Sequence, residues 1–101
     1  MSVININKEN FESEVLASSV PVLLDFYADW CSSCRKVSPI VDEIAVERED
    51  IKVCKVNVGE ESELSEKFRI MSIPAFVVMK DGKIVNKAVG ARPKSSILEM
   101  L

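Results

Sequence analysis

The 101-residue chain contains no histidine, only three glycines and three cysteines, and no long apolar run. Without histidine it cannot form a Ser-His-Asp triad, a His-ligated zinc site or an imidazole acid–base pair. Gly59, Gly82 and Gly90 are too few and too scattered for a glycine-rich phosphate loop. The longest apolar stretch, 73–79, is far shorter than the roughly 20 residues that span a bilayer.

The charge balance disfavours two classes of partner. The chain has 13 basic and 16 acidic residues, a net charge of −3 and a pI near 5.0. Nucleic acids and anionic membranes both select clustered Lys and Arg, so we expect neither as a partner. The length and the 48% hydrophobic content predict one domain, residues 1–101, able to fold without disulfide or metal staples.

The first twenty residues show no targeting signal. They include three glutamates and lack the continuous apolar core of a signal peptide, so we expect a cytoplasmic protein. In a reducing compartment three cysteines do not form a structural framework. They are therefore reactive, metal-binding or simply buried.

Apolar periodicity alternates between strand and helix along the chain. Residues 21–28 are apolar on both faces apart from Asp25, which predicts a central strand covered by helices on both sides. Asp81-Gly82 predicts a tight hairpin, which makes the sheet mixed. Pro39 lies inside a helical pattern and predicts a kink there. The predicted order is β-α-β-α-β-α-β-β-α, over residues 3–6, 7–16, 21–28, 34–48, 51–58, 61–68, 75–80, 83–89 and 93–101.

A C-x-x-C motif, Cys31 to Cys34, stands where the buried strand gives way to a helix. The first turn of a helix has unpaired N–H groups and the positive end of the macrodipole. A thiolate at Cys31 is stabilised there, and its pKa should fall below the usual value of about 8.5. One turn of helix brings both sulfurs within bonding distance.

The C-x-x-C motif belongs to a longer set of segments: D-F-Y-A-x-W-C-x-x-C at 25–34, Pro39, K-V-N-V at 55–58, M-S-I-P at 71–74, K-D-G-K at 80–83 and V-G-A at 89–91. With these segments the sequence resembles the thioredoxin family over essentially the whole chain. The resemblance implies a thioredoxin fold, an α/β architecture whose central five-stranded mixed sheet is flanked by four helices. It also implies a cis peptide bond between Ile73 and Pro74.

The resemblance implies a protein disulfide reductase. Cys31 is then the nucleophile and Cys34 the resolving thiol, and Asp25 accepts the Cys34 proton with Lys55 as its neighbour. The family's partners are disulfide-containing proteins and a thioredoxin reductase, and we expect a monomer with no bound cofactor. The expected docking surface comprises Trp30, Ile73, Pro74, Gly90 and Ala91.

The chain departs from the family between the two cysteines. The usual Gly-Pro is Ser32-Ser33, whose hydroxyls we expect to tune the redox potential through the Cys31 thiolate. The third cysteine, Cys54, lies mid-strand between valines, and we interpret it as a small buried hydrophobe.

Two alternatives stay open. In the first, a protein with the same fold works in the opposite direction, as a disulfide oxidase or isomerase. The lack of a signal peptide disfavours this alternative. In the other alternative the C-x-x-C motif binds a metal or cluster, although a tetrahedral site needs four ligands and only Cys54 or carboxylates could supply the rest. We therefore predict no metal.

Overall fold

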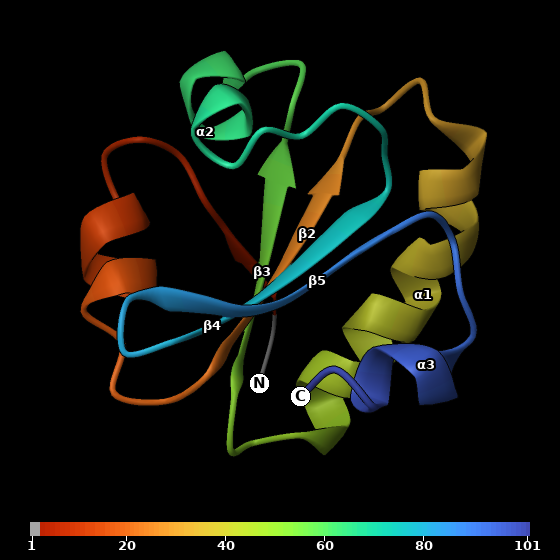
Figure 1. Ribbon diagram of the computed structural model, residues 1–101. Coiled ribbons are helices and arrows are strands. Elements are labelled where there is room, and N and C mark those ends of the chain that lie inside the picture. Colours follow the sequence, from red (N-terminus) through yellow and green to blue (C-terminus); the bar gives the residue numbers. More distant parts are fainter. Residues whose placement is uncertain (1–2) are drawn as a thin grey trace.

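The computed structural model describes residues 3–101, which form a five-stranded sheet in the order β1-β3-β2-β4-β5 (Figure 1). β1, β3 and β2 are parallel, and β4 and β5 are antiparallel to their neighbours. The predicted mixed sheet and the predicted order of elements are confirmed. The strands are β1 (Ile4–Asn5), β2 (Val22–Tyr27), β3 (Lys52–Asn57), β4 (Ala75–Lys80) and β5 (Lys83–Val89). The helical segments are η1 (Glu12–Leu16), α1 (Ser32–Glu47), α2 (Ser62–Lys67) and α3 (Lys94–Leu98).

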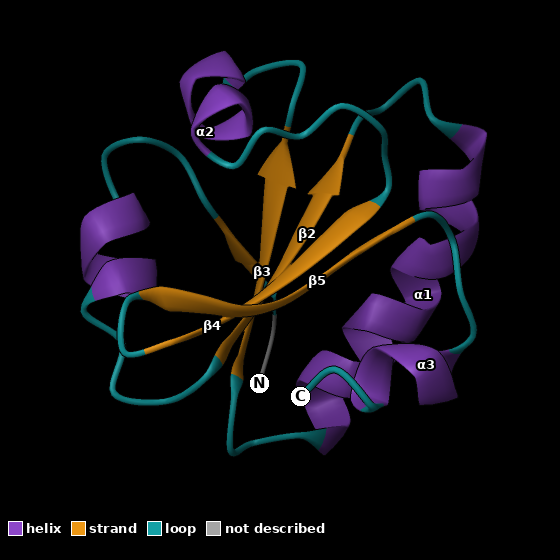
Figure 2. Ribbon diagram, viewed as in Figure 1, coloured by secondary structure: helices purple, strands orange, loops and turns teal. Residues whose placement is uncertain are grey.

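The helices cover both faces of the sheet, η1 and α2 on one side and α1 and α3 on the other (Figure 2). Each face has its own buried cluster. Phe11, Val15 and Phe68 pack on the first face, whereas Val41, Ile44 and Ile97 pack on the second. Alternate side chains of each central strand supply one cluster or the other, as expected for a sheet buried on both sides.

β2 occupies the centre of the sheet, as its apolar pattern predicts. It lies between β3 and β4, and its residues from Val22 to Phe26 are buried. Asp25 is the charged residue in this strand, with only 2% of its surface exposed. The fold therefore places a carboxyl in the interior, at the end of the strand that leads to the C-x-x-C motif.

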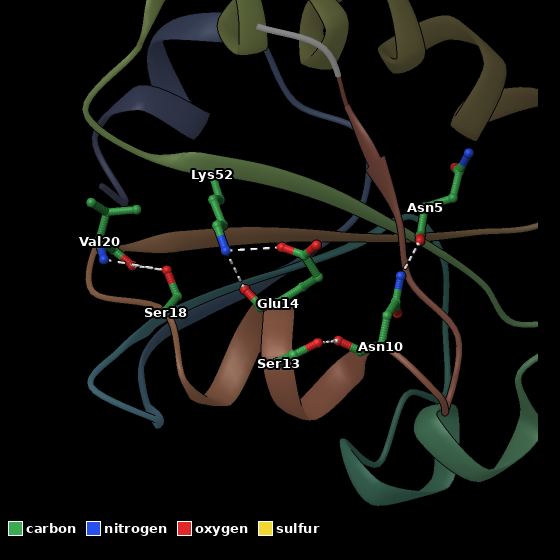
Figure 3. Close-up of polar contacts among 7 residues, drawn as sticks. All are labelled: Asn5, Asn10, Ser13, Glu14, Ser18, Val20 and Lys52. Atoms are coloured by element: carbon green, nitrogen blue, oxygen red, sulfur yellow. Dashed lines mark hydrogen bonds and ion pairs between the residues drawn. The ribbon is translucent and has the colours of Figure 1, made fainter.

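The first helical segment differs from its prediction. Asn7 does accept a hydrogen bond from the Asn10 N–H (2.9 Å), as a helix cap would, but a turn follows and η1 is a short π-helix starting at Glu12. Lys52 of β3 holds η1 against the sheet (Figure 3). Its Nζ lies 2.9 Å from Glu14 Oε1 and 3.1 Å from the Glu14 carbonyl oxygen.

The turn between β4 and β5 takes the form that its sequence predicts. Asp81 (φ 52°) and Gly82 (φ 76°) both have positive φ, which is the signature of a two-residue type I′ hairpin.

The predicted helix that contains Pro39 forms as α1, and it continues through this proline to Glu47. None of the helices in residues 3–101 is long and apolar enough to cross a membrane.

Candidate active site

Cys31 and Cys34 lie at the start of α1, just after β2 ends at Tyr27. Cys31 is the N-cap of the helix and has extended backbone angles (φ −95°, ψ 107°), while Cys34 is in the first turn. A disulfide joins them, with their Cα atoms 5.3 Å apart. The strand-to-helix transition predicted from the sequence is thus the element that brings the two sulfurs together.

Three polar groups surround the Cys31 sulfur. The Cys34 N–H donates to Cys31 Sγ at 3.2 Å, and the Ser33 hydroxyl lies 3.4 Å from the same atom. The Ile73 carbonyl oxygen is 4.0 Å away. Two of these groups, the Cys34 N–H and the Ser33 hydroxyl, can donate to a Cys31 thiolate, which would also lie at the positive end of the helix dipole.

The two serines between the cysteines are not equivalent. Ser33 is half-buried with its hydroxyl at the Cys31 sulfur, whereas Ser32 is exposed. Among residues 3–101, the Ser32 hydroxyl makes no contact with that sulfur within hydrogen-bond distance. Of the two hydroxyls, that of Ser33 is therefore the one placed to donate to a Cys31 thiolate.

Both cysteines are largely covered, with 7% of Cys31 and 4% of Cys34 exposed. They pack with Ala28, and Tyr27 and Ile73 border this cluster. The difference in exposure is small, so any difference in reactivity must arise from local electrostatics and from the direction of attack. Their neighbour Trp30 is 74% exposed.

A second loop approaches the disulfide from across the chain. The Ile73–Pro74 peptide bond is cis, as predicted. The Gly90 N–H donates to the Pro74 carbonyl oxygen at 2.7 Å, which fixes the end of β5 to this loop. Gly90 has φ 100° and no heavy atom within 4 Å of where a Cβ would be, so its backbone conformation, not crowding, favours glycine. Ala91 follows it and is exposed.

Asp25 is buried behind the disulfide. Its Oδ1 has no hydrogen-bond partner among the residues that the structure describes. Burial raises the pKa of this carboxyl from 3.8 to about 7; the nearby Lys55 charge acts to lower it and the Asp42 charge to raise it. A carboxyl with a pKa near neutrality can take up and release a proton under physiological conditions.

Lys55 stands directly opposite Asp25 in the parallel register of β2 and β3. Its ammonium, however, is bound on the α1 side. Nζ donates to Ser38 Oγ at 2.7 Å and pairs with Asp42 Oδ1 at 3.3 Å. The expected neighbour of Asp25 is therefore in place, but its ion pair is with Asp42.

Sequence reasoning missed Ser38 and Asp42. Together with Cys34 they are spaced four residues apart along α1, so they share one stripe of the helix. That spacing was the available signal. Both side chains contact Lys55 of β3, which lies directly opposite Asp25 in the sheet.

A cavity of about 260 Å³ connects these groups. Asp25, Cys34, Ser38 and Lys55 all line it, and Tyr27 and Arg35 are also in its wall. Its wall combines these polar side chains with apolar surface, and it has room for several water molecules. The cavity thus offers a route for a proton between the Cys34 sulfur and the Asp25 carboxyl.

Cys54 lies apart from this site. It is fully buried in the core beneath η1 and α2, and burial raises the pKa of its thiol to about 12. Its interpretation as a small buried hydrophobe is confirmed. Within residues 3–101, no group of three or more His, Cys, Asp or Glu side chains is arranged to hold a metal ion.

Comparison with known proteins agrees with this geometry. A family model described as thioredoxin matches residues 2–101. Thioredoxin 1 of Synechococcus elongatus is 45% identical over 97 residues, which cover 95% of this chain and 91% of the relative. Thioredoxin of Pyropia yezoensis is 43% identical over 102 residues (100% and 95% coverage), and that of Mycobacterium tuberculosis is 40% identical over 101 (99% and 87%). The chain therefore belongs to the thioredoxin family of thiol–disulfide oxidoreductases.

Proposed function

We propose that the protein reduces disulfides in other proteins through the Cys31–Cys34 dithiol. The observation that supports this most strongly is the environment of Cys31. Cys31 is the N-cap residue of α1, and its Sγ accepts a hydrogen bond from the Cys34 N–H at 3.2 Å. In the oxidised state the same sulfur is bonded to Cys34. A thiolate stabilised in this way is available at neutral pH to attack a disulfide.

The reaction proceeds in two exchanges. In the first, the Cys31 thiolate attacks one sulfur of the substrate disulfide; a mixed disulfide forms and the other substrate sulfur leaves as a thiolate. In the second, Cys34 attacks Cys31 Sγ, the mixed disulfide breaks and the second substrate sulfur leaves. The substrate gains two electrons and the Cys31–Cys34 disulfide forms.

Asp25 is our candidate for the base in the second exchange. Cys34 must lose its proton to become a nucleophile, and both it and Asp25 line the same cavity. A water molecule in that cavity would carry the proton to the carboxyl. The pKa of Asp25, near 7, suits a group that accepts a proton and later returns it to solvent.

The substrate would dock on the surface around the disulfide. Trp30 and Ala91 are exposed there, and Ile73 and Gly90 are half-buried beside them. Pro74 is buried and supports the loop from below. In the described chain the Ile73 backbone makes no backbone hydrogen bond, so it is free to pair with an extended substrate segment as an added strand.

The same proposal covers partners and place of action. A thioredoxin reductase would return two electrons to the Cys31–Cys34 disulfide, and the oxidoreductase itself would work as a monomer without a bound cofactor. We place it in the cytoplasm, because a protein that reduces disulfides acts where thiols are kept reduced.

Reduction of insulin disulfides driven by dithiothreitol tests the proposal. We expect wild type to accelerate insulin precipitation and Cys31→Ser to lose the acceleration. Cys54→Ala is the matched control, since it removes a cysteine outside the site and should keep activity. Wild type no faster than Cys31→Ser would refute the proposed function.

A second candidate, oxidation of dithiols, is favoured by one observation. The Ser33 hydroxyl at Cys31 Sγ stabilises a thiolate that exists only in the reduced protein, and so makes the disulfide more oxidising. A redox titration against glutathione distinguishes the two, since an oxidase would have a potential well above that of the cytosolic glutathione pool.

A further inference from the structure

Two carboxylates, Asp25 and Asp42, lie near Lys55, and its ammonium pairs with Asp42. Adjacent strands lie about 4.8 Å apart, and residues in parallel register project to the same face, so Lys55 begins beside Asp25. A flexible lysine side chain at that place can reach a neighbouring carboxylate. Instead its ammonium is bound to Ser38 Oγ at 2.7 Å and to Asp42 Oδ1 at 3.3 Å, and Asp25 Oδ1 has no hydrogen-bond partner among the described residues.

Building on the proposed function, we propose that Ser38 and Asp42 are positioning residues, which hold the Lys55 ammonium on the α1 side of the cavity and keep it from pairing with Asp25. Among the described residues, neither side chain makes a hydrogen bond or ion pair with Cys31 or Cys34. Their effect passes through Lys55 to the carboxyl that takes the Cys34 proton.

Of the groups around Asp25 described below, Lys55 is the cation that could pair with its carboxylate. β4 presents Phe76 opposite Asp25, which is apolar. Arg35, a second cation in the cavity wall, donates its Nη1 to the Asp29 carbonyl oxygen at 2.7 Å and is committed there. The remaining titratable groups lining the cavity are Cys34, Tyr27 and Asp29.

Two effects of Asp42 act in the same direction. It holds the ammonium away from Asp25, and its own negative charge raises the pKa of that carboxyl. Ser38 is neutral and has only the first effect. Because the Asp42 side chain is 60% exposed, solvent screens its charge, and we expect changes of about half a pH unit to one unit, at the low end of what a nearby opposite charge produces.

The direct experiment is a carbon-13 NMR titration of the Asp25 carboxyl in the oxidised protein. We expect a midpoint about one unit lower in Asp42→Asn and about half a unit lower in Ser38→Ala than in wild type. Ser38→Thr keeps a hydroxyl and should restore the wild-type midpoint. The same spectra show whether each variant is folded.

Two controls separate positioning from a general change of charge. Glu43→Gln makes the same charge change one residue along α1, but Glu43 pairs with Lys94 away from the cavity, so the Asp25 midpoint should not move. In a Lys55→Gln background, Ser38→Ala should have no effect on the midpoint, because the group that it positions is gone.

The proposal is overturned if Ser38→Ala and Asp42→Asn leave the Asp25 midpoint unchanged, or if Ser38→Ala has the same effect with and without Lys55. A kinetic readout accompanies the titration: the acidic limb of the pH profile of insulin reduction should move to lower pH in Asp42→Asn. If wild type reduces insulin but the Asp25 midpoint does not change in the Ser38 and Asp42 variants, only this inference is refuted. Inactive wild type refutes the proposed function, and the titration still reports on Lys55.

Discussion

Removing the buried carboxyl should stabilise the protein at neutral and alkaline pH. The pKa of Asp25 is about 7 in the folded protein and near 3.8 when it is exposed. Between these values the folded chain keeps a proton that the unfolded chain has lost, so stability declines as pH rises. The penalty is absent below about pH 4, is complete above about pH 7, and amounts to about 4 kcal/mol.

Asp25→Ala removes this penalty and loses about 1 kcal/mol of side-chain contacts. We therefore expect the oxidised variant to be about 3 kcal/mol more stable than wild type at pH 8. At pH 4 the order should reverse, with the variant slightly less stable. The variant should also reduce insulin more slowly, because the proton acceptor that we propose is missing.

Urea denaturation of both oxidised proteins at pH 4, 6 and 8 measures this directly. The slope of free energy against urea should match between the two proteins, which confirms that stability and not compactness has changed. A variant no more stable than wild type at pH 8 would refute the reasoning. So would a gain of equal size at pH 4 and pH 8, since burial of a titrating carboxyl must depend on pH.

Three further predictions concern reactivity, redox potential and the hairpin. In the reduced protein, iodoacetamide should label Cys31 first, Cys34 slowly and Cys54 only on unfolding, as read by peptide mass mapping; earlier labelling of Cys54 would contradict its full burial. In a glutathione redox titration, Ser33→Ala should lower the redox potential by about 30 mV, and replacing Ser32-Ser33 by Gly-Pro should do the same. Ser32→Ala should leave the potential unchanged. An equal or higher potential in Ser33→Ala would exclude the Ser33 hydroxyl as a donor to the thiolate. Gly82→Ala should cost about 1 kcal/mol and lower the melting temperature by about 4–8 °C, because Gly82 has φ 76°; an unchanged melting temperature would argue against this turn geometry.

The fold was predictable because its signals are local. Apolar residues on both faces of 21–28 could only be satisfied at the centre of a covered sheet, and β2 lies there. Asp81-Gly82 has the backbone freedom of a type I′ turn, and the turn forms. The cysteine pair follows a strand and begins a helix, which is enough to predict its electrostatics.

The unpredicted features depend on distances between elements, or on backbone angles and turn hydrogen bonds that apolar periodicity does not contain. Whether Lys55 binds Asp25 or Asp42 is decided by how α1 packs on β3, and apolar periodicity does not contain that spacing. The choice of Ser33 over Ser32 depends on the angles of the helix cap at Cys31. η1 begins later than expected because turn hydrogen bonds of Asn7 and Asn10 compete with the first helical turn.

The most direct test of the central claim is to trap the mixed disulfide. Cys34→Ser cannot complete the second exchange, so when it is incubated with a disulfide-containing substrate we expect a stable adduct, joined through Cys31, in the intact mass and the peptide map. Cys31→Ser should form none under the same conditions. An adduct joined through Cys54, or one formed equally well by Cys31→Ser, would contradict the assignment of Cys31 as the attacking nucleophile.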